Sequence, residues 1–571
     1  MPLSTRKRIF SGFFLFILLL GAWLYFQRFT RVALENYVPT TALGYVEVND
    51  VPGLLKQFAT TQAWQELAPL YGLQNALHYA GWANWWGRWV GIGTKESLLM
   101  ARGQFALVVS GIEMRGEEVK PRWALIIETH RSEASVKSLM AAHLPELAQR
   151  ALQQTVQEAS EYSGVPITIF RAPNTDRQLL SASYGSTWLL ANDAATLQAC
   201  LDVRQGRVAP LAQNPLLAQA KAEVDQSGAV FAFISNDGAA RLSQFFTHLL
   251  IGKTLAGTPL AGMPEGVMSE ISENTVEAMA YSASFADGGV VDRYAIVCKP
   301  EVAQSLQTAL RAPGNSAPEK SEALKFVPAD AQEVTLVTLT DPGQALDGIE
   351  RIVSGHLGVA QSFLFHKFFT SARKTFLGLE PGENPSTAVG SEVVRFGLEA
   401  GDDLDRVWMV AARNRQQLTQ LAERLLRQQD LNVGRIKLQN AELTSNGKRA
   451  FAWLGNYLVL GNTEHVMRLL EEQGKTNSLL TAPPFTAAER PALKDKTVMH
   501  SFHSVADDTQ EMMTALARRL RGNPQANAQI VLERLPWAAA VTALTERGVV
   551  CESLSPVGNF PMIVNFVDSV F

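Results

Sequence analysis

Two histidines lie close enough in the sequence to suggest a metal site. His500 and His503 stand in the stretch MHSFHS and are the closest pair among nine histidines. The stretch matches VFAFIS, which begins at Val230 and reads as a β-strand. Strand residues three apart point to opposite faces, so the two imidazoles would not reach one ion. His356 and His366 lack acidic or cysteine ligands at a suitable spacing, so we predict no metal ligand.

Phosphate binding and nucleophilic catalysis are equally unsupported. Gly-Lys-Thr occurs at residues 252–254 and 474–476. A phosphate-binding loop also needs a glycine five residues earlier, where this chain has Thr247 and Leu469. No Gly-x-Ser-x-Gly motif occurs, and no pair of carboxylates stands out as an acid–base couple. The sequence therefore predicts no catalytic and no cofactor-binding residue, and a hydrolase with residues gathered from distant loops is the least favoured function.

Two aromatic clusters are the remaining candidates for a functional surface. GWANWWGRW places four tryptophans at helical spacing. In the second half of the chain, the stretch FLFHKFFTSARKTFLGL begins with four phenylalanines within its first seven residues. Packing onto a sheet is the simplest interpretation, and a surface for a protein partner, a lipid or a carbohydrate is the alternative. These candidate residues are Trp82, Trp85, Trp86, Trp89, Phe363, Phe365, Phe368 and Phe369.

Length and composition indicate a large globular protein. The chain has 571 residues, of which 47% are hydrophobic and 19% charged, with a formal net charge of −4. This length exceeds a usual single core, so two or more domains are expected. No basic block long enough to hold a phosphate backbone occurs beyond the N-terminus, which argues against a nucleic-acid partner.

The N-terminus predicts a membrane anchor. Residues 9–26 carry no charge and would span roughly 27 Å as a helix. A cleaved signal peptide is the alternative, but the run is long and lacks a small-residue cleavage pattern. Three basic residues precede the span and two follow it, which favours a cytoplasmic tail at residues 1–8. We therefore expect a single-pass protein of the bacterial inner membrane, with most of its mass in the periplasm.

Three cysteines are too few for a disulfide framework. Cys200, Cys298 and Cys551 are widely separated, and an odd one would remain after any pairing. We interpret them as small apolar residues on one helix and two strands, while one bridged pair stays open as an alternative.

The rest of the chain has the pattern of a tandem duplication of one module. Two segments are similar in sequence: YGSTWLLANDAATLQACL from residue 184 and LGNYLVLGNTEHVMRLLE from residue 454. Five other pairs of similar segments occur in the same order in the two halves. The offsets fall steadily from 289 to 259 residues along the chain. A Pro-, Ser- and charge-rich stretch at residues 312–325 has the composition of a linker. We predict a first module at residues 38–311 and a duplicate at residues 327–571.

Local patterns within each module are mixed. Short runs of β-branched and aromatic residues alternate with helical stretches such as residues 132–159, and Asp287-Gly288 favours a hairpin. Asn192 is available as a helix cap. We expect an α+β fold: a transmembrane helix, then two tandem modules, each with a largely antiparallel sheet and packing helices.

The chain resembles an uncharacterised, membrane-anchored bacterial family, domain-of-unknown-function family 3352. The resemblance lies in the basic tail and single span, in the strand from Pro39 to Val48, and in strands like GQFALVV. It would cover residues 38–571. It implies the same architecture but no established activity and no catalytic residues.

These observations favour a non-enzymatic, membrane-anchored protein that binds or organises a protein partner outside the cytoplasm. The alternative is a carrier or chaperone for a lipid or another hydrophobic ligand, which requires a continuous dry cavity of several hundred Å³.

Overall fold

The computed structural model describes residues 31–74, 103–115, 118–224, 228–250, 266–286, 288–312, 318–398, 406–429, 432–438, 441–472, 478–493, 495–520, 522–525 and 527–564. The predicted span at residues 9–26 and the four predicted tryptophans lie outside these ranges. Within them, no helix is both long and apolar enough to cross a bilayer. The predicted membrane anchor lies outside the described residues and stays a prediction.

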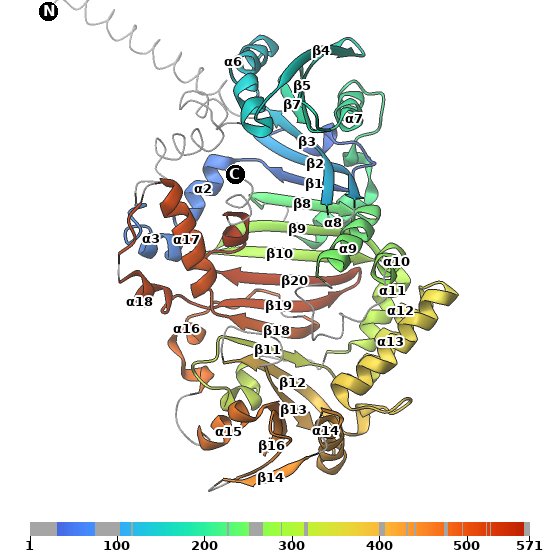
Figure 1. Ribbon diagram of the computed structural model, residues 1–571, viewed down its shortest axis with the longest axis vertical. Helices are drawn as coiled ribbons and strands as arrows, with labels where there is room; N and C mark the ends of the chain where they lie inside the picture. The colour runs from blue at the N-terminus through green and yellow to red at the C-terminus, as the bar shows by residue number, and fades with distance from the viewer. Residues whose placement is uncertain are drawn as a thin grey trace, which may run out of the picture.

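A single antiparallel sheet of twenty strands runs the length of the molecule (Figure 1). Its first ten strands, in spatial order, are β4 (Val156–Tyr162), β5 (Val165–Arg171), β6 (Gln178–Tyr184), β7 (Thr187–Ala191), β3 (Glu118–Glu128), β2 (Gln104–Arg115), β1 (Gly44–Val48), β8 (Val230–Ser235), β9 (Val276–Ala286) and β10 (Gly289–Cys298). The other ten are β20 (Gly548–Ser555), β19 (Ala538–Thr545), β18 (Thr497–His503), β11 (Glu333–Thr338), β12 (Val389–Gly397), β13 (Val407–Ala412), β17 (Tyr457–Asn462), β16 (Arg449–Leu454), β15 (Glu442–Ser445) and β14 (Gly434–Lys437).

The expectation of two separate sheets is wrong. Strand β10, the last of the first half, pairs along its length with β20, the last of the second half. Both strands carry alternating apolar residues and would otherwise be free edges, so pairing them satisfies both rows of backbone groups. One continuous sheet replaces the two predicted ones.

The two halves nevertheless use the same pairing order. In the first half, β1 lies between β2 and β8; in the second, β11 lies between β12 and β18. Arg293 of β10 lies opposite Glu552 of β20, and their side chains approach to 3.8 Å. These two residues occupy corresponding positions in the two similar halves of the sequence. This pair marks the centre of an approximate two-fold arrangement. The predicted module bounds stay a prediction.

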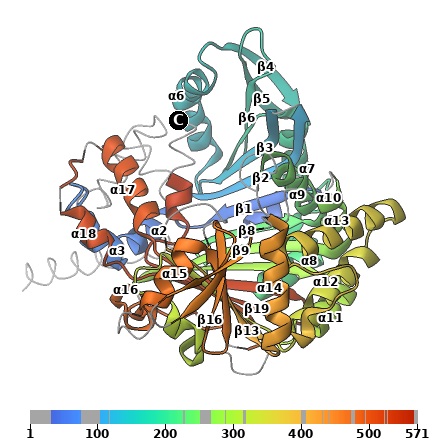
Figure 2. The same cartoon turned by 60° about the horizontal axis from the view of Figure 1, so that its bottom comes forward.

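Helices gather in two groups at opposite ends of the central strands (Figures 1 and 2). The left group in Figure 1 contains α2 (Val51–Phe58), α3 (Gln62–Leu67), α17 (Ala506–Leu520) and α18 (Ala528–Leu532). The right group contains α9 (Asn236–Leu250), α10 (Val267–Thr275), α11 (Pro300–Ala309), α12 (Pro342–Gly355) and α13 (Val359–Leu377). Each group combines helices from both halves, so the halves interlock at both ends of the strands.

The left group has a continuous apolar core. Trp64 of α3 packs against Phe58 of α2, with ring centroids 5.5 Å apart, and both belong to one buried cluster with Met512, Met513 and Leu516 of α17. In the right group, Phe365 of α13 packs with Val267 of α10. Helices α2 and α12, which follow equivalent strands, both begin at a capping aspartate with proline in the first turn.

One broad face of the sheet is covered by the remaining helices. Helices α7 (Ala194–Arg204) and α8 (Pro215–Glu223) pack on the first half, and α15 (Thr463–Glu472) packs on the second. Among the described helices, α6 (Glu133–Leu152) and α14 (Arg415–Gln429) pack on the other face, over the outer strands of each half. Short helical turns at Leu34–Tyr37, Leu211–Gln213, Pro318–Lys320, Ala323–Phe326, Pro385–Thr387, Leu479–Thr481 and Pro483–Thr486 complete the described elements.

Several local predictions are confirmed. Helix α6 covers most of the predicted helix, and β9 and β10 form the predicted hairpin, with Gly288 at φ +80° in its turn. The helix cap at residue 192 is wrong: Asp193 caps α7 by accepting from the Thr196 backbone N–H at 2.9 Å. Asn192 instead accepts a bond from the Trp123 backbone N–H and so fastens this turn to β3.

Candidate functional site

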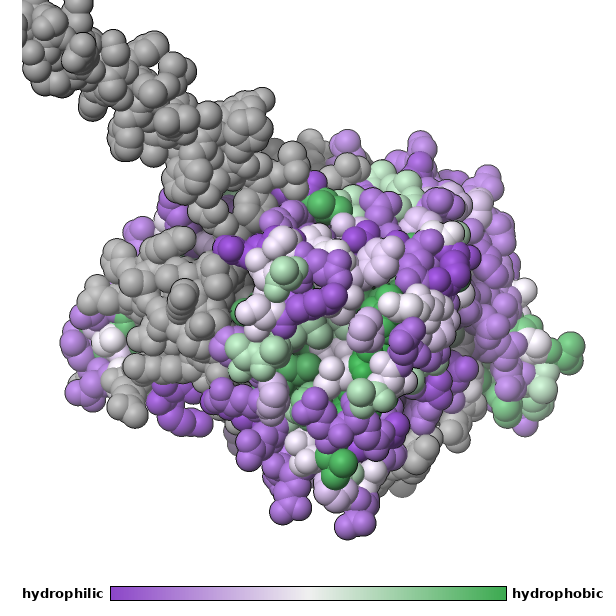
Figure 3. All heavy atoms as spheres, turned by 90° about the horizontal axis from the view of Figure 1, so that it is seen from above, coloured by the Kyte–Doolittle hydropathy of each residue, from purple (hydrophilic) through white to green (hydrophobic). Residues whose placement is uncertain are grey.

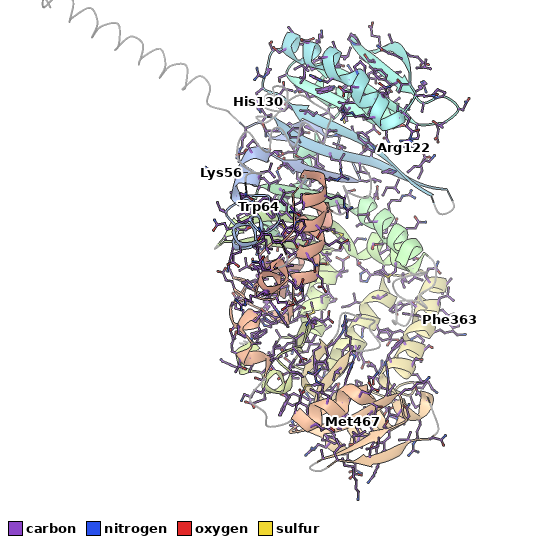
Figure 4. All side chains as sticks on the ribbon, turned by 60° about the vertical axis from the view of Figure 1, so that its left-hand side comes forward. Lys56, Trp64, Arg122, His130, Phe363 and Met467 are labelled. Carbon is purple, nitrogen blue, oxygen red and sulfur yellow. The ribbon has the colours of Figure 1, made fainter. Side chains whose placement is uncertain are left out.

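The predicted phenylalanine cluster does not form one surface. Phe365 is buried, and Phe368 and Phe369 are partly buried beside it against α10. Phe363 is 57% exposed and lies on the outside of α13 (Figure 4), where Val359 and Leu364 are also exposed. Helix α13 reaches furthest to the right in Figures 1 and 2, and hydrophobic residues appear at that side of the otherwise mostly hydrophilic view in Figure 3.

The predicted placement of two histidines on one strand, and of three cysteines on one helix and two strands, is confirmed. His500 and His503 both lie on β18, three residues apart. Cys200 lies on α7, Cys298 on β10 and Cys551 on β20, and all three thiols are free. Among the described residues, no group of three or more His, Cys, Asp or Glu side chains could hold a metal ion.

The opposite, largely uncovered face of the central strands carries a row of apolar and aromatic side chains. Residues directly opposite one another in antiparallel strands share a face, so the pairing registers identify the members of the row. From β3 to β18 they are Leu125, Leu107, Val46, Ala232, Tyr281, Tyr294, Cys551, Thr542 and Met499. We call this the open row. It crosses nine strands, a length of about 40 Å at the usual strand spacing.

Exposure separates the two faces of the same strands. In the open row, Val46 is 37%, Leu107 40% and Tyr294 38% exposed. On the covered face, their neighbours Tyr45 and Val108 are at most 1% exposed. The small side chain of Ala232 lies between Val46 and Tyr281 in the row.

Polar groups gather at the centre of the open row, where the two halves meet. The Tyr281 hydroxyl donates to the Asp292 carboxylate at 2.6 Å, and the two tyrosine rings of the row lie 5.0 Å apart. The Asn559 side-chain amide donates to the hydroxyls of both Tyr281 and Tyr294. Asn559 belongs to the C-terminal segment at residues 556–564, whose Phe560 packs on Phe58 of the left helix group at 4.1 Å between ring centroids. This cluster joins the sheet floor to the left group.

Burial controls the protonation of the cluster. Asp292 is almost fully buried, which raises its pKa to about 6, although hydrogen bonds from Tyr281 and Asn559 oppose the rise. Burial, and then the neighbouring Asp292 charge, raise the pKa of Tyr281. Burial also raises the pKa of Cys551, so its thiol is a poor nucleophile. The cluster is suited to positioning the two phenol groups rather than to nucleophilic chemistry.

The described residues line two hollows of several hundred Å³ at the right-hand ends of the strands, and charged side chains stand in the wall of each. One, of about 610 Å³, lies between β2, β3, α9 and α10, with Arg122, Asp237 and Arg241 in its wall. The other, of about 470 Å³, lies between α11 and α12, with Asp347 and Arg351 in its wall. Neither is the dry apolar cavity that a lipid carrier requires.

Sequence reasoning missed the open row. Its residues come from strands up to 505 positions apart in the chain, from Val46 to Cys551. No local feature of either strand shows that these two residues share a face.

 The available signal was the unusual pair of tyrosines at Tyr281 and Tyr294, which flank the predicted hairpin at equal distance from its turn.

Comparison with known proteins does not identify the chain: no protein-family model, no curated protein and no solved structure matches it. The resemblance to a family of unknown function therefore stays a prediction, and the function has to be argued from the fold.

Proposed function

We propose that this chain is a non-enzymatic binding protein that holds a partner protein across the open row. The observation that supports this proposal is the row itself: apolar side chains such as Val46 and Leu107 stay more than a third exposed in the middle of a large sheet. Exposed apolar surface that is continuous and framed by polar groups is typical of interaction sites.

The shape of the surface favours a protein over a small hydrophobic ligand. Sites for small ligands enclose most of the ligand in a concave cavity, whereas the open row is long and shallow. Tyr294 presents an apolar ring with a polar tip, and tyrosine is enriched where protein interfaces concentrate their binding energy. The hollow beside Arg122 and Asp237, at the ends of β2 and β3, offers charged groups for the polar rim that such interfaces need.

Site-specific photo-cross-linking tests the proposal. A photoreactive phenylalanine analogue replaces Leu107 or Tyr294 in cells that produce the protein, and the cells are irradiated. Two control positions of similar exposure are Ile530 on α18, which is 54% exposed, and Phe363 on α13. We expect one protein adduct of defined mass from both positions of the open row and none from Ile530.

Three results would count against the proposal. The first is the absence of any protein adduct at Leu107 and Tyr294. The second is equal labelling at all four positions, which indicates non-specific contact. The third is an adduct at Phe363 alone, which would move the binding surface to α13.

A further inference from the structure

The two free edges of the sheet carry opposite charges. Strand β4 pairs only with β5, and strand β14 pairs only with β15, so each leaves one row of backbone groups unpaired within the described residues. Six of the seven residues of β4 and all four of β14 are exposed. Strand β4 contains Glu158 and Glu161 and no cation, whereas β14 contains Arg435 and Lys437 and no anion.

From these edges we infer that the chain assembles end to end with further copies of itself, β14 of one copy pairing with β4 of the next. The two strands hold equivalent places in the two halves. If their charges served only to prevent aggregation, charges of the same sign would protect both edges equally well. Charges of opposite sign instead disfavour β4–β4 and β14–β14 contacts and favour the β4–β14 contact. Head-to-tail contacts of this kind extend into a chain of molecules unless the rotation between copies closes a ring.

The directions of the two edge strands fit this contact. Every pairing in the sheet is antiparallel, and nineteen pairings separate β4 from β14, so these strands run in opposite directions. A copy displaced along the sheet, with the same face covered, would bring its β4 antiparallel to the first copy's β14. The contact therefore continues the existing pattern of the sheet.

The registers also place the charges on matching faces. Ile436 of β14 lies opposite Leu443, which is buried on the covered side, so Arg435 and Lys437 point to the other side. On β4, Ser160 lies opposite the buried Ile167, so Glu161 points away from the covered side as well. A continued sheet thus places Glu161 on the face of the two cations.

Existing ion pairs leave these groups available. Glu158 contacts Arg171 at 3.1 Å and Arg435 contacts Glu442 at 3.7 Å, but all four side chains are at least 44% exposed. Such exposed pairs contribute at most about 1 kcal/mol each and exchange partners at little cost. Glu161 and Lys437 form no ion pair with any other described residue.

Sedimentation velocity of the purified full-length chain over a range of concentrations tests the inference. We compare wild type with Glu161→Lys, with the double variant Arg435→Glu/Lys437→Glu, and with Glu133→Lys on α6 as a control that has the same charge change as Glu161→Lys but lies outside the edge strand. We expect wild type and the control to form dimers and longer species, weakened by added salt. Each edge variant should associate about tenfold more weakly.

Mixing the two edge variants gives the sharpest result. Strand β4 of the Glu161→Lys variant then meets the acidic β14 of the double variant. The acidic β4 of the double variant meets the basic β14 of the Glu161→Lys variant, so association should return to the wild-type level. A monomeric wild type at every concentration would overturn the inference. So would association that the edge variants do not weaken, or that mixing does not restore. These outcomes leave the open row untouched, so the two proposals fail independently.

Discussion

The two faces of the central sheet differ in what covers them, although their sequences look alike. On β1, Tyr45 is buried in a core that includes Phe233 of β8, while the next residue, Val46, is 37% exposed. Both faces carry apolar residues, so hydrophobicity alone does not distinguish core from surface here. The difference arises from α7, α8 and α15, which close one face, whereas the helices near the other face stand at its ends and over its outer strands. One face stabilises the fold, and the other is free to bind.

The largest expected effect on stability comes from removing a buried side chain from the covered face. Phe233→Ala should lower the free energy of unfolding by about 3–5 kcal/mol, because it removes a fully buried ring and leaves a cavity. Leu107→Ala on the open row should cost less than about 1 kcal/mol, because the side chain already contacts water. Urea denaturation measures both values. Equal costs would contradict the distinction between the two faces.

A second prediction concerns Asp292, beneath the C-terminal segment. Burial raises its pKa from 3.8 in the unfolded chain to about 6 in the folded protein. Between these two pH values, the folded protein retains a proton on Asp292 that the unfolded chain releases. The contribution of this proton to the stability of the fold is therefore complete below about pH 4 and is lost as the pH rises through about 6. The expected loss is about 3 kcal/mol.

The variant Asp292→Asn isolates this effect, because it keeps the size and the hydrogen-bonding oxygen but does not titrate. We compare the free energy of unfolding of wild type and variant between about pH 4 and pH 7. The difference between the two proteins should change over this range. A constant difference would show that Asp292 does not bury its charge when the protein folds.

The smallest effect is a difference in thiol reactivity. Cys551 lies in the open row with intermediate exposure, whereas Cys200 beneath the covered face is buried. In the folded protein, a thiol reagent should modify Cys551 slowly, since burial raises the pKa of this thiol, and Cys200 only after unfolding. Mass spectrometry of the modified peptides measures both rates. Faster modification of Cys200 would contradict the assignment of the faces.

Local structure could be predicted from the sequence, and the joining of the halves could not. Alternating and helical periodicity located strands such as β1 and helices such as α6, because these patterns depend on neighbouring residues. The β10–β20 pairing depends on strands 259 positions apart, and nothing in either strand specifies its partner. The same limit applies to the site. Phe363, one of the predicted surface residues, is exposed, but finding the open row required the registers of nine strands.

The proposed binding role of the open row is tested most directly by placing a long charged side chain within the row. Ala232→Arg places a long charged side chain between Val46 and Tyr281, and Ala360→Arg makes the same change on exposed α13. The measurement is the yield of the protein adduct from the photoreactive group at Tyr294, with a melting curve to verify folding and Leu107→Ser as a second variant. We predict that Ala232→Arg and Leu107→Ser lower the yield about tenfold or more, and that Ala360→Arg leaves it unchanged. An unchanged yield in folded Ala232→Arg and Leu107→Ser, or an equal loss in Ala360→Arg, would contradict the account.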